Sequence, residues 1–465
     1  MPQVLRIEQL VDEQAIGRFN INLLLWSFLA MIADGYDISS LASAAPQLAR
    51  TWHILPKDFA PALSASLFGV LFGAPLLGYV GDRFGRRTAI VAGCIIYGLG
   101  TLATVWVGNL NQVTGLRFVT GIGIGGLMPN TISLNSELAP KRLRAMLVVL
   151  MFTGITLGSA TPGAIQAWLI PKYGWQIMFW IGGIAPLLIA VCLVFALPES
   201  VKYLTLRPRR RQELLAITRR LRPDLAIAED AQFVMAPAPQ ASGSGLTQIF
   251  GNGLAWITPL LWICFGCALM ANYFLNSWLP LIFESNGLSP QQSGIATSLY
   301  HYGGTLAGLL VSFVLGRFGM SIVAILFLLA APAIAAIGFP GISYVAIASM
   351  ASLAGFCVLG AQFGNNAASG LLYPTAFRSR GVGWALGIGR FGSIVGPLLG
   401  GALIGMKLPL QKLFLLAAVP MAVGMVACLA LTRLCYKRLG NLQLDDIPVA
   451  TPAIAADAPV AANLK

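Results

Sequence analysis

The sequence predicts an all-α integral membrane protein whose twelve transmembrane helices form two six-helix bundles. The composition, the spacing of the apolar runs and an internal repeat all indicate this fold. Of the 465 residues, 57% are hydrophobic and 10% are charged, which is more apolar surface than a soluble domain can bury. The net charge of +13 suggests no nucleic-acid partner, because the Lys and Arg residues stand in short segments between apolar runs, as membrane topology predicts.

Twelve apolar runs are each long enough to span a bilayer. They lie near residues 18–40, 59–80, 88–107, 111–135, 145–167, 175–197, 255–283, 291–315, 320–340, 342–371, 382–404 and 411–435. The interval between the sixth and seventh runs opens with arginines and ends in Pro, Gly and Ser, and the chain after residue 439 is rich in Ala and Pro. We therefore expect an N-terminal bundle (1–202), a linker (203–253), a C-terminal bundle (254–439) and a disordered tail (440–465).

Two motifs of the first half recur in the second. Gly-Asp-Arg-Phe-Gly at 81–85 returns as Leu-Gly-Arg-Phe-Gly at 315–319, and the pair Pro140 and Arg144 returns as Pro374 and Arg378. Both motifs recur at the same spacing along the chain. Such a shared offset indicates two halves related by duplication, with a binding site expected between them near the middle of the membrane.

The basic residues predict the orientation. With the N-terminus inside, most Lys and Arg residues, including the linker arginines, fall on the cytoplasmic side, which agrees with cytoplasmic termini in a cytoplasmic membrane. The N-terminus is acidic and no small-residue cleavage site follows the first run, so that run is expected to remain as a spanning helix. The outer set holds only Arg50, Lys57, Lys172, Lys407 and Lys412.

No pattern for enzyme chemistry is visible in the sequence. Cys264 and Cys267 form a CxxC inside an apolar run, without a second Cys or His cluster, so we interpret all seven cysteines as structural thiols. The glycine strings near residues 121–126 and 396–401 lie in apolar helices and predict close helix packing, not nucleotide binding. We expect no catalytic activity, no metal and no cofactor.

The loop Gly-Tyr-Val-Gly-Asp-Arg-Phe-Gly-Arg-Arg at 78–87 joins the second and third runs. It resembles the cytoplasmic loop signature of the major facilitator superfamily. An acid at a helix end can pair with cationic or dipolar groups of a neighbour, so the motif predicts a gate; the alternative is a plain basic loop. Gly316 replaces the acid in the second half, which predicts a weaker partner there. The gating set comprises Asp82, Arg83, Arg86, Glu137 and Arg144.

Two acids, Asp34 and Asp37, lie deep in the first apolar run within Asp-Gly-Tyr-Asp. Acids in hydrocarbon are costly and mark function, and a spacing of three places both on roughly one helix face. Arg117 lies within a spanning run of the first half, at a depth in the membrane that matches the depth of the two acids. We therefore predict that Asp34 and Asp37 carry protons under the influence of Arg117; a purely structural acid–arginine pair is the alternative.

The Asp-Gly-aromatic-Asp pattern is similar to the first-helix signature of the aromatic acid:proton symporter family. Arg117-Phe-Val-Thr-Gly, Pro198-Glu-Ser, Tyr373-Pro-Thr and Gly389-Arg-Phe-Gly extend the resemblance over residues 20–435, except for most of the linker. It implies import of a small aromatic carboxylate with protons by alternating access. It also implies that the first, fourth, seventh and tenth helices line a central cavity. The implied partners are that acid, protons and the bilayer, and we expect a monomer.

Arg390 is the predicted counter-charge for the substrate, because a guanidinium binds a carboxylate with two parallel bonds and we expect Gly389 and Gly392 to leave room beside it. His301 is a candidate proton relay, or else an inert hydrogen-bonded side chain. The other substrate-binding candidates, which could equally bond helix to helix, are Asn272, Tyr273, Asn276, Trp278, Gln362, Asn365, Asn366 and Trp384.

Three other functions compete with import of an aromatic acid. The same scaffold could carry another small organic acid, such as a muconate-like dicarboxylate. A non-transporting membrane sensor is disfavoured because the sequence holds no soluble signalling domain. Efflux is disfavoured because Gly154, Gly158, Pro162 and Gly163 only loosely resemble the antiporter motif of the fifth helix.

Overall fold

A computed structural model describes residues 3–235, 247–251, 254–339, 341, 343–373 and 378–439. Within these ranges, the side chains of residues 141–146, 148, 149, 247, 248, 316, 379, 438 and 439 are outside the description. Arg144 and Gly316 of the predicted gate therefore have a described backbone only, and Pro374 and Thr375 lie outside the described residues.

Twelve long helices make up most of the part of the chain that the structure describes. The first six are α2 (Arg18–Trp52), α3 (Ala60–Phe84), α4 (Arg86–Ala103), α5 (Leu110–Leu138), α6 (Lys141–Trp168) and α8 (Gln176–Ala196). The second six are α12 (Ile257–Ser285), α13 (Pro290–Phe318), α14 (Met320–Ile337), α15 (Tyr344–Leu372), α16 (Arg378–Gly405) and α17 (Leu410–Leu439). These confirm the predicted fold class.

Ten of the twelve are long and apolar enough to cross a membrane when only the described residues are considered. The other two are α5 and α6. Helix α5 buries Arg117, Asn130 and Asn135, and these polar side chains lower its hydropathy. Buried polar groups of this kind face protein and not lipid, and they mark functional or interhelical sites.

Eleven of the predicted runs agree with the observed helices to within a few residues. The first does not: it was expected to end near residue 40, but α2 continues to Trp52. Its polar serines interrupt the apolar run without ending the helix, because they find partners inside the protein. Ser40 Oγ donates to the Asp37 carbonyl at 2.9 Å, and Ser39 Oγ donates to Asn276 Oδ1 at 2.8 Å.

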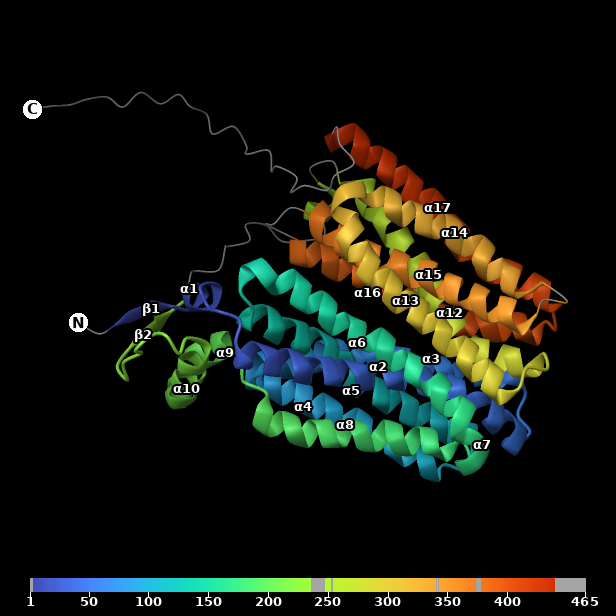
Figure 1. Ribbon diagram of the computed structural model, residues 1–465, viewed down its shortest axis with the longest axis horizontal. Coiled ribbons are helices and arrows are strands. Elements are labelled where there is room, and N and C mark those ends of the chain that lie inside the picture. The colour runs from blue at the N-terminus through green and yellow to red at the C-terminus, as the bar shows by residue number, and fades with distance from the viewer. Residues whose placement is uncertain are drawn as a thin grey trace, which may run out of the picture.

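The helices form two bundles that lie against each other (Figure 1). In the N-terminal bundle α2 packs on α6, α3 and α4 pack on α5, and α4 packs on α8. The C-terminal bundle repeats each pairing in order, with α12 on α16, α13 and α14 on α15, and α14 on α17. This correspondence matches the duplication that the sequence motifs indicated. Contacts of α6 with α13, α2 with α12 and α3 with α16 join the bundles.

The first part of the predicted linker has a fold of its own, which the sequence pattern did not predict. Strand β2 (Gln232–Val234) pairs in parallel with β1 (Val4–Arg6), and α1 (Ile7–Asp12) contacts α10 (Arg211–Leu221). Apolar residues of α1 and α10 share a buried core cluster with the end of α5. The remaining short elements are η1 (Pro56–Phe59), η2 (Thr104–Trp106), α7 (Ile170–Tyr173), α9 (Val201–Thr205), η3 (Pro208–Arg210) and α11 (Thr247–Phe250).

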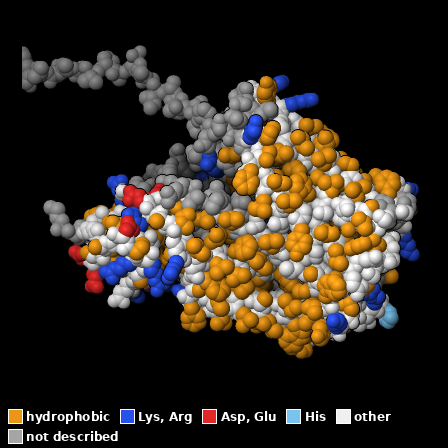
Figure 2. Space-filling model, viewed as in Figure 1, with side chains coloured by type: hydrophobic (Ala, Val, Ile, Leu, Met, Phe, Trp, Pro, Cys, Tyr) orange, Lys and Arg blue, Asp and Glu red, His pale blue; other side chains and the backbone are white. Residues whose placement is uncertain are grey.

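Hydrophobic side chains cover the flanks of the bundles, whereas Lys and Arg gather at the ends (Figure 2). Large apolar residues such as Phe195, Phe313 and Leu188 are more than half exposed. An apolar flank of this extent is stable when lipid surrounds it. The surface therefore agrees with a multi-pass membrane protein.

Candidate substrate-binding cavity

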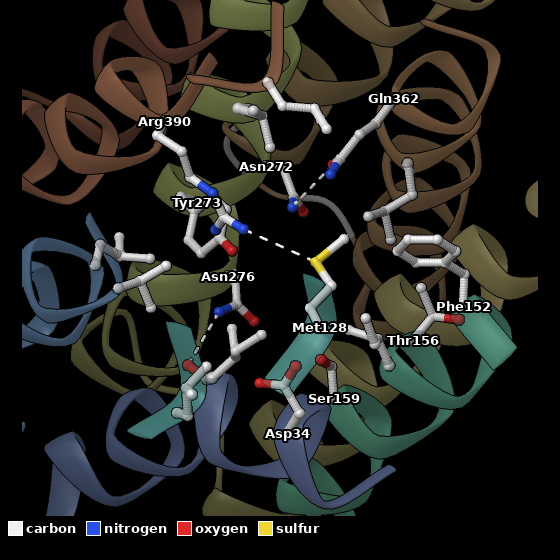
Figure 3. Close-up of a pocket in the computed structure, with 18 of the residues that line it drawn as sticks. Asp34, Met128, Phe152, Thr156, Ser159, Asn272, Tyr273, Asn276, Gln362 and Arg390 are labelled. Carbon is white, nitrogen blue, oxygen red and sulfur yellow. Dashed lines mark hydrogen bonds between the residues drawn. The ribbon is translucent and has the colours of Figure 1, made fainter. Parts of the chain in front are cut away.

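A cavity of about 130 Å³ lies between the two bundles. One wall comes from α2, α3, α5 and α6, and the other from α12, α13, α15 and α16. The predicted first, fourth, seventh and tenth helices (α2, α5, α12 and α15) all contribute, and the second, fifth, eighth and eleventh helices contribute as well. Polar side chains from both bundles point into the space between them (Figure 3).

Arg390 of α16 lines this cavity. Its polar neighbour across the space is Met128 of α5, whose sulfur lies 3.9 Å from Nη2, and Tyr273 lies beside it (Figure 3). Among the described residues, no carboxylate lies within ion-pair distance of this guanidinium. A guanidinium that faces a cavity without a carboxylate partner keeps donors that a carboxylate ligand could accept.

The glycines next to Arg390 serve packing and do not make room beside it. A Cβ at Gly392 would overlap the backbone of Gly266, and one at Gly389 would meet Leu269 and Phe265 of α12. They therefore allow α12 and α16 to approach closely, as small residues do in membrane helix pairs. This contact holds the segment that carries Arg390 against α12.

Asp37 forms a fully buried ion pair with Arg117. Arg117 Nη1 donates to Asp37 Oδ1 at 2.9 Å, and Nη2 donates to Oδ2 at 2.8 Å and to the Asp37 carbonyl at 3.0 Å. Thr101 Oγ1 donates a further bond to Oδ1 at 2.7 Å. Neither residue lines the cavity. The carboxylate is thus saturated with donors and closed off from any ligand.

Asp34 differs from Asp37 although it lies only three residues earlier on α2. It is buried, it lines the cavity, and its Oδ1 has no hydrogen-bond partner. Figure 3 shows its carboxyl group pointing into the space below Met128. Arg117 makes its hydrogen bonds to Asp37 and none to Asp34. The structure therefore separates two acids that the sequence analysis treated as one unit.

His301 of α13 also lines the cavity. Its Nε2 lies 2.9 Å from Asn276 Oδ1, which accepts a second bond from Ser39. Because the amide oxygen only accepts, this geometry assigns the Nε2 proton to the imidazole. The chain of three side chains connects α13, α12 and α2, and so crosses from one bundle to the other.

The structure divides the predicted substrate-binding residues into two groups. Those that line the cavity, besides Arg390, are Asn272, Tyr273, Asn276, Gln362 and Asn366. Asn272 and Gln362 are joined at 3.3 Å, and the Tyr300 hydroxyl donates to Asn272 Oδ1 at 2.9 Å. This amide pair forms a polar patch on the wall of the C-terminal bundle.

The other three predicted residues do not line the cavity. Trp278 is fully buried and donates its indole N–H to the Pro397 carbonyl at 3.0 Å, which joins α12 to α16. Asn365 is buried on α15 outside the cavity lining. Trp384 is 43% exposed and stacks on Trp262.

Sequence reasoning missed part of the lining, including one face of the fifth helix. Phe152, Thr156 and Ser159 of α6 line the cavity and follow a helical spacing that places them on one face. That spacing is the signal that could have found them. The other missed residues with aromatic or sulfur-containing side chains are Met128, Phe265 and Phe363.

The gating set lies at one end of the N-terminal bundle, away from the cavity. Arg86 pairs with the exposed Asp82 at 2.5 Å and donates to Asn130 Oδ1 of α5 at 3.3 Å. Arg83 donates to the Tyr79 hydroxyl at 2.6 Å. Glu137 accepts bonds from Ser133 and Ser200.

Glu199, which belongs to the Pro198-Glu-Ser motif, lies next to this set. It accepts bonds from the backbone N–H groups of Arg87 at 3.2 Å and Ser200 at 2.9 Å. Burial raises the pKa of its carboxyl group above the usual value. Gly85 has a φ of 106°, and a Cβ there would overlap the Glu199 carboxylate. This turn therefore needs glycine.

At the opposite end, the two bundles are joined by polar contacts. Arg50 of α2 pairs with the buried Glu284 of α12 at 2.7 Å, and Gln166 of α6 donates to Glu284 at 2.8 Å and to Ser293 at 3.2 Å. Ser298 of α13 donates to the Ala160 carbonyl at 2.7 Å. These contacts close the cavity on the side remote from β1, α1 and α10 (Figure 1).

Two repeated six-helix bundles around a central cavity, lined by an acid and by a cation without a carboxylate partner among the described residues, are the architecture of membrane transporters. The family model for the Major Facilitator Superfamily matches residues 27–367 and 261–441. The chain belongs to this superfamily, which confirms the resemblance that the loop motif carried.

The chain is similar to two curated transporters from Pseudomonas putida. The 4-hydroxybenzoate transporter PcaK is 35% identical over 424 residues, which covers 91% of this chain and 94% of the relative. The gallate transporter is 32% identical over 425 residues, with 91% and 94% covered. Among solved structures, a D-xylose-proton symporter superposes with a TM-score of 0.66 at 17% identity, over 88% of this chain and 97% of that one. The protein is accordingly a transporter and not an enzyme.

Proposed function

We propose that this protein imports a small aromatic carboxylate of the benzoate or hydroxybenzoate type together with protons, by alternating access across the cytoplasmic membrane. The observation that carries the proposal is the pair of unpartnered opposite charges in the cavity. Arg390 lies beside Met128 and has no carboxylate partner among the described residues, and the Asp34 Oδ1 atom has no hydrogen-bond donor. An anionic substrate would neutralise the first, and a proton would neutralise the second.

The cavity suits one ring with one carboxylate. Its volume of about 130 Å³ is close to the roughly 150 Å³ that holds a benzene molecule in an apolar site. Tyr273, Phe152 and Phe363 supply aromatic surface. A benzoate-type acid ionises near pH ~4 and is an anion at neutral pH, so it needs a counter-charge to leave water.

The relatives also support a ring acid over a dicarboxylate. Their names specify 4-hydroxybenzoate and gallate, both aromatic monocarboxylates. A muconate-like dicarboxylate carries two negative charges, and Arg390 is the only Lys or Arg among the lining residues that the structure describes. One guanidinium compensates one carboxylate, which favours the monoanion.

Asp34 is the proposed proton carrier. It shares the cavity with Arg390, so a proton on Asp34 and an anion on Arg390 would leave the loaded cavity without net charge. One proton per monoanion makes transport electroneutral, with a driving force of about 1.4 kcal/mol per pH unit. His301 remains the alternative carrier, although its hydrogen bond to Asn276 ties it to the interface between the bundles.

The contacts around Glu284 support one state of the proposed cycle, in which the cavity is closed at that end. With both termini in the cytoplasm, as the basic residues predict, the joined end faces outward and the cavity is closed from outside. Opening to that side would break the Arg50–Glu284 and Gln166–Glu284 contacts. The gating set at the other end, Asp82, Arg83, Arg86, Glu137 and Arg144, is proposed to control the cytoplasmic opening.

Uptake into proteoliposomes under an imposed pH gradient tests the proposal. The panel should contain labelled 4-hydroxybenzoate, benzoate, muconate and an aliphatic monocarboxylate. We expect gradient-driven accumulation of the ring acids, abolished by a protonophore. Accumulation of muconate alone would support the dicarboxylate alternative, and binding of acids without uptake of any would support a sensor.

A further inference from the structure

The C-terminal bundle has an open groove of about 980 Å³ between the start of α12 and the end of α17. Its floor includes the apolar residues Leu260 and Leu434. Trp256 and Tyr436 form an aromatic rim and are 72% and 56% exposed. None of the residues lining this groove contributes to the central cavity. The groove is therefore a separate feature on the outside of the bundle.

Two cations, Arg433 and Lys437, stand one helical turn apart on the same face of α17, and both line the groove. Neither forms an ion pair with any described residue. The sequence of α17 contains no Asp or Glu, and the one acid of α12, Glu284, lies at its far end. In Figure 2, the acidic side chains in view gather near β1 and α10 and not at this end of the C-terminal bundle.

Cations at a helix C-terminus offset the helix dipole and need no ligand for that role. The helix dipole does not explain why an apolar groove with an exposed tryptophan lies directly beside them. Trp and Tyr occupy the headgroup level of a bilayer, and basic pockets between transmembrane helices bind the headgroups of anionic lipids. The groove brings aromatic, apolar and basic side chains together in one place.

We propose that this groove binds an anionic phospholipid of the cardiolipin or phosphatidylglycerol class. Its phosphate would pair with Arg433 and Lys437, and an acyl chain would lie along Leu260 and Leu434, between the two aromatic side chains. A zwitterionic lipid fills the same apolar surface, but its headgroup leaves the two positive charges uncompensated. This inference is independent of the transported substrate.

Native mass spectrometry of the delipidated full-length protein in detergent tests the proposal, with cardiolipin, phosphatidylcholine and inorganic phosphate titrated separately. The test variant is Arg433→Gln/Lys437→Gln. The matched control is Lys407→Gln/Lys412→Gln, which removes two exposed cations, one from the connection before α17 and one from its first turn. We expect cardiolipin to bind the test variant about thirty-fold more weakly, at about 1 kcal/mol per cation, with the control unchanged.

A melting temperature equal to that of the unmodified protein shows that the test variant is folded. If it is not folded, Lys437→Gln alone is measured, with an expected loss of about fivefold. Equal affinity for cardiolipin and phosphatidylcholine, or an equal loss in test and control variants, would overturn the proposal. Displacement of cardiolipin by millimolar phosphate would identify a small-anion site and would overturn the assignment to a lipid.

Discussion

Two acid–arginine couples near the central cavity differ in whether a ligand can reach them. Asp37 and Arg117 are joined within one bundle by three hydrogen bonds and are inaccessible to ligands. Asp34 and Arg390 face the same cavity from different bundles, and no hydrogen bond joins them. The charges of the first couple neutralise each other, whereas the second couple leaves an acid and a cation facing the cavity. The comparison supports the proposal that the two acids of one motif have different roles, Asp37 in structure and Asp34 in transport.

The first prediction concerns the closed couple and has the largest expected effect. Asp37→Asn leaves Arg117 charged and buried without its counter-ion, which costs about 3–5 kcal/mol of folding free energy. We expect a strongly lowered melting temperature and poor recovery from the membrane. Thermal unfolding in detergent measures this, with Asp37→Leu/Arg117→Met as the control that removes both charges and restores stability.

A different result would reassign the proton site. If Asp37→Asn has an unchanged melting temperature and binds substrate but no longer accumulates it, then Asp37 carries the proton. The closed couple would then have to open during the cycle, and the distinction between the two acids would fail.

The second prediction concerns the acid of the open couple. Asp34→Asn removes the titrating group but keeps the size of the side chain, so the protein should remain folded and should lose accumulation against a gradient completely. Exchange of labelled for unlabelled substrate should survive, because it needs no net proton movement. Measured in the same vesicles, accumulation that persists under a pH gradient would exclude Asp34 and would make His301 the next candidate.

The third prediction concerns the cation of the open couple. Arg390→Lys keeps the charge but loses the two-pronged grip on a carboxylate. One lost charge-assisted hydrogen bond is worth about 1.5–3 kcal/mol, so the affinity for an aromatic acid should fall at least about tenfold. Equilibrium binding by scintillation proximity measures this, with Arg83→Lys, outside the cavity, as the matched control. Unchanged affinity in a folded Arg390→Lys protein would refute the assigned role.

The fold could be predicted from the sequence because short stretches of the sequence determine where each helix spans the membrane. A helix that spans a bilayer needs a long apolar run. The motif around Arg83 recurs around Arg317, which indicates the duplication. The site could be predicted only as a set of rare residues at the right depth. Asp34, Asp37, Arg117 and Arg390 were found because charges in hydrocarbon stand out.

The pairing among those charges could not be predicted, because it depends on helix rotation, which the sequence does not state directly. Their similar position along the helices placed Arg117 near both acids in the prediction. The rotation of α2 about its axis brings only Asp37 into hydrogen-bond contact with Arg117. Trp384 and Trp278 fail for the same reason: one faces outward and the other packs on α16. Phe152 and Thr156 were missed because no motif marks their helix face.

The last prediction extends the comparison to a third couple, Asp82 and Arg86, which is joined at 2.5 Å but exposed, with the Asp82 side chain 68% accessible. Exposed ion pairs contribute about 0–1 kcal/mol, so Asp82→Asn should barely change the melting temperature. Its expected effect is on the transport rate, which should fall severalfold if, as proposed, the couple holds the end of α3 against α4 and α5 in one state of the gate. The set of acids that compete for uptake should stay the same, since no member of this couple lines the cavity. Initial rates and competition profiles in proteoliposomes test both statements, with Asp58→Asn at the opposite end of α3 as the control for loss of an acid. A changed competition profile would show that the third couple takes part in substrate choice and is not only a gate.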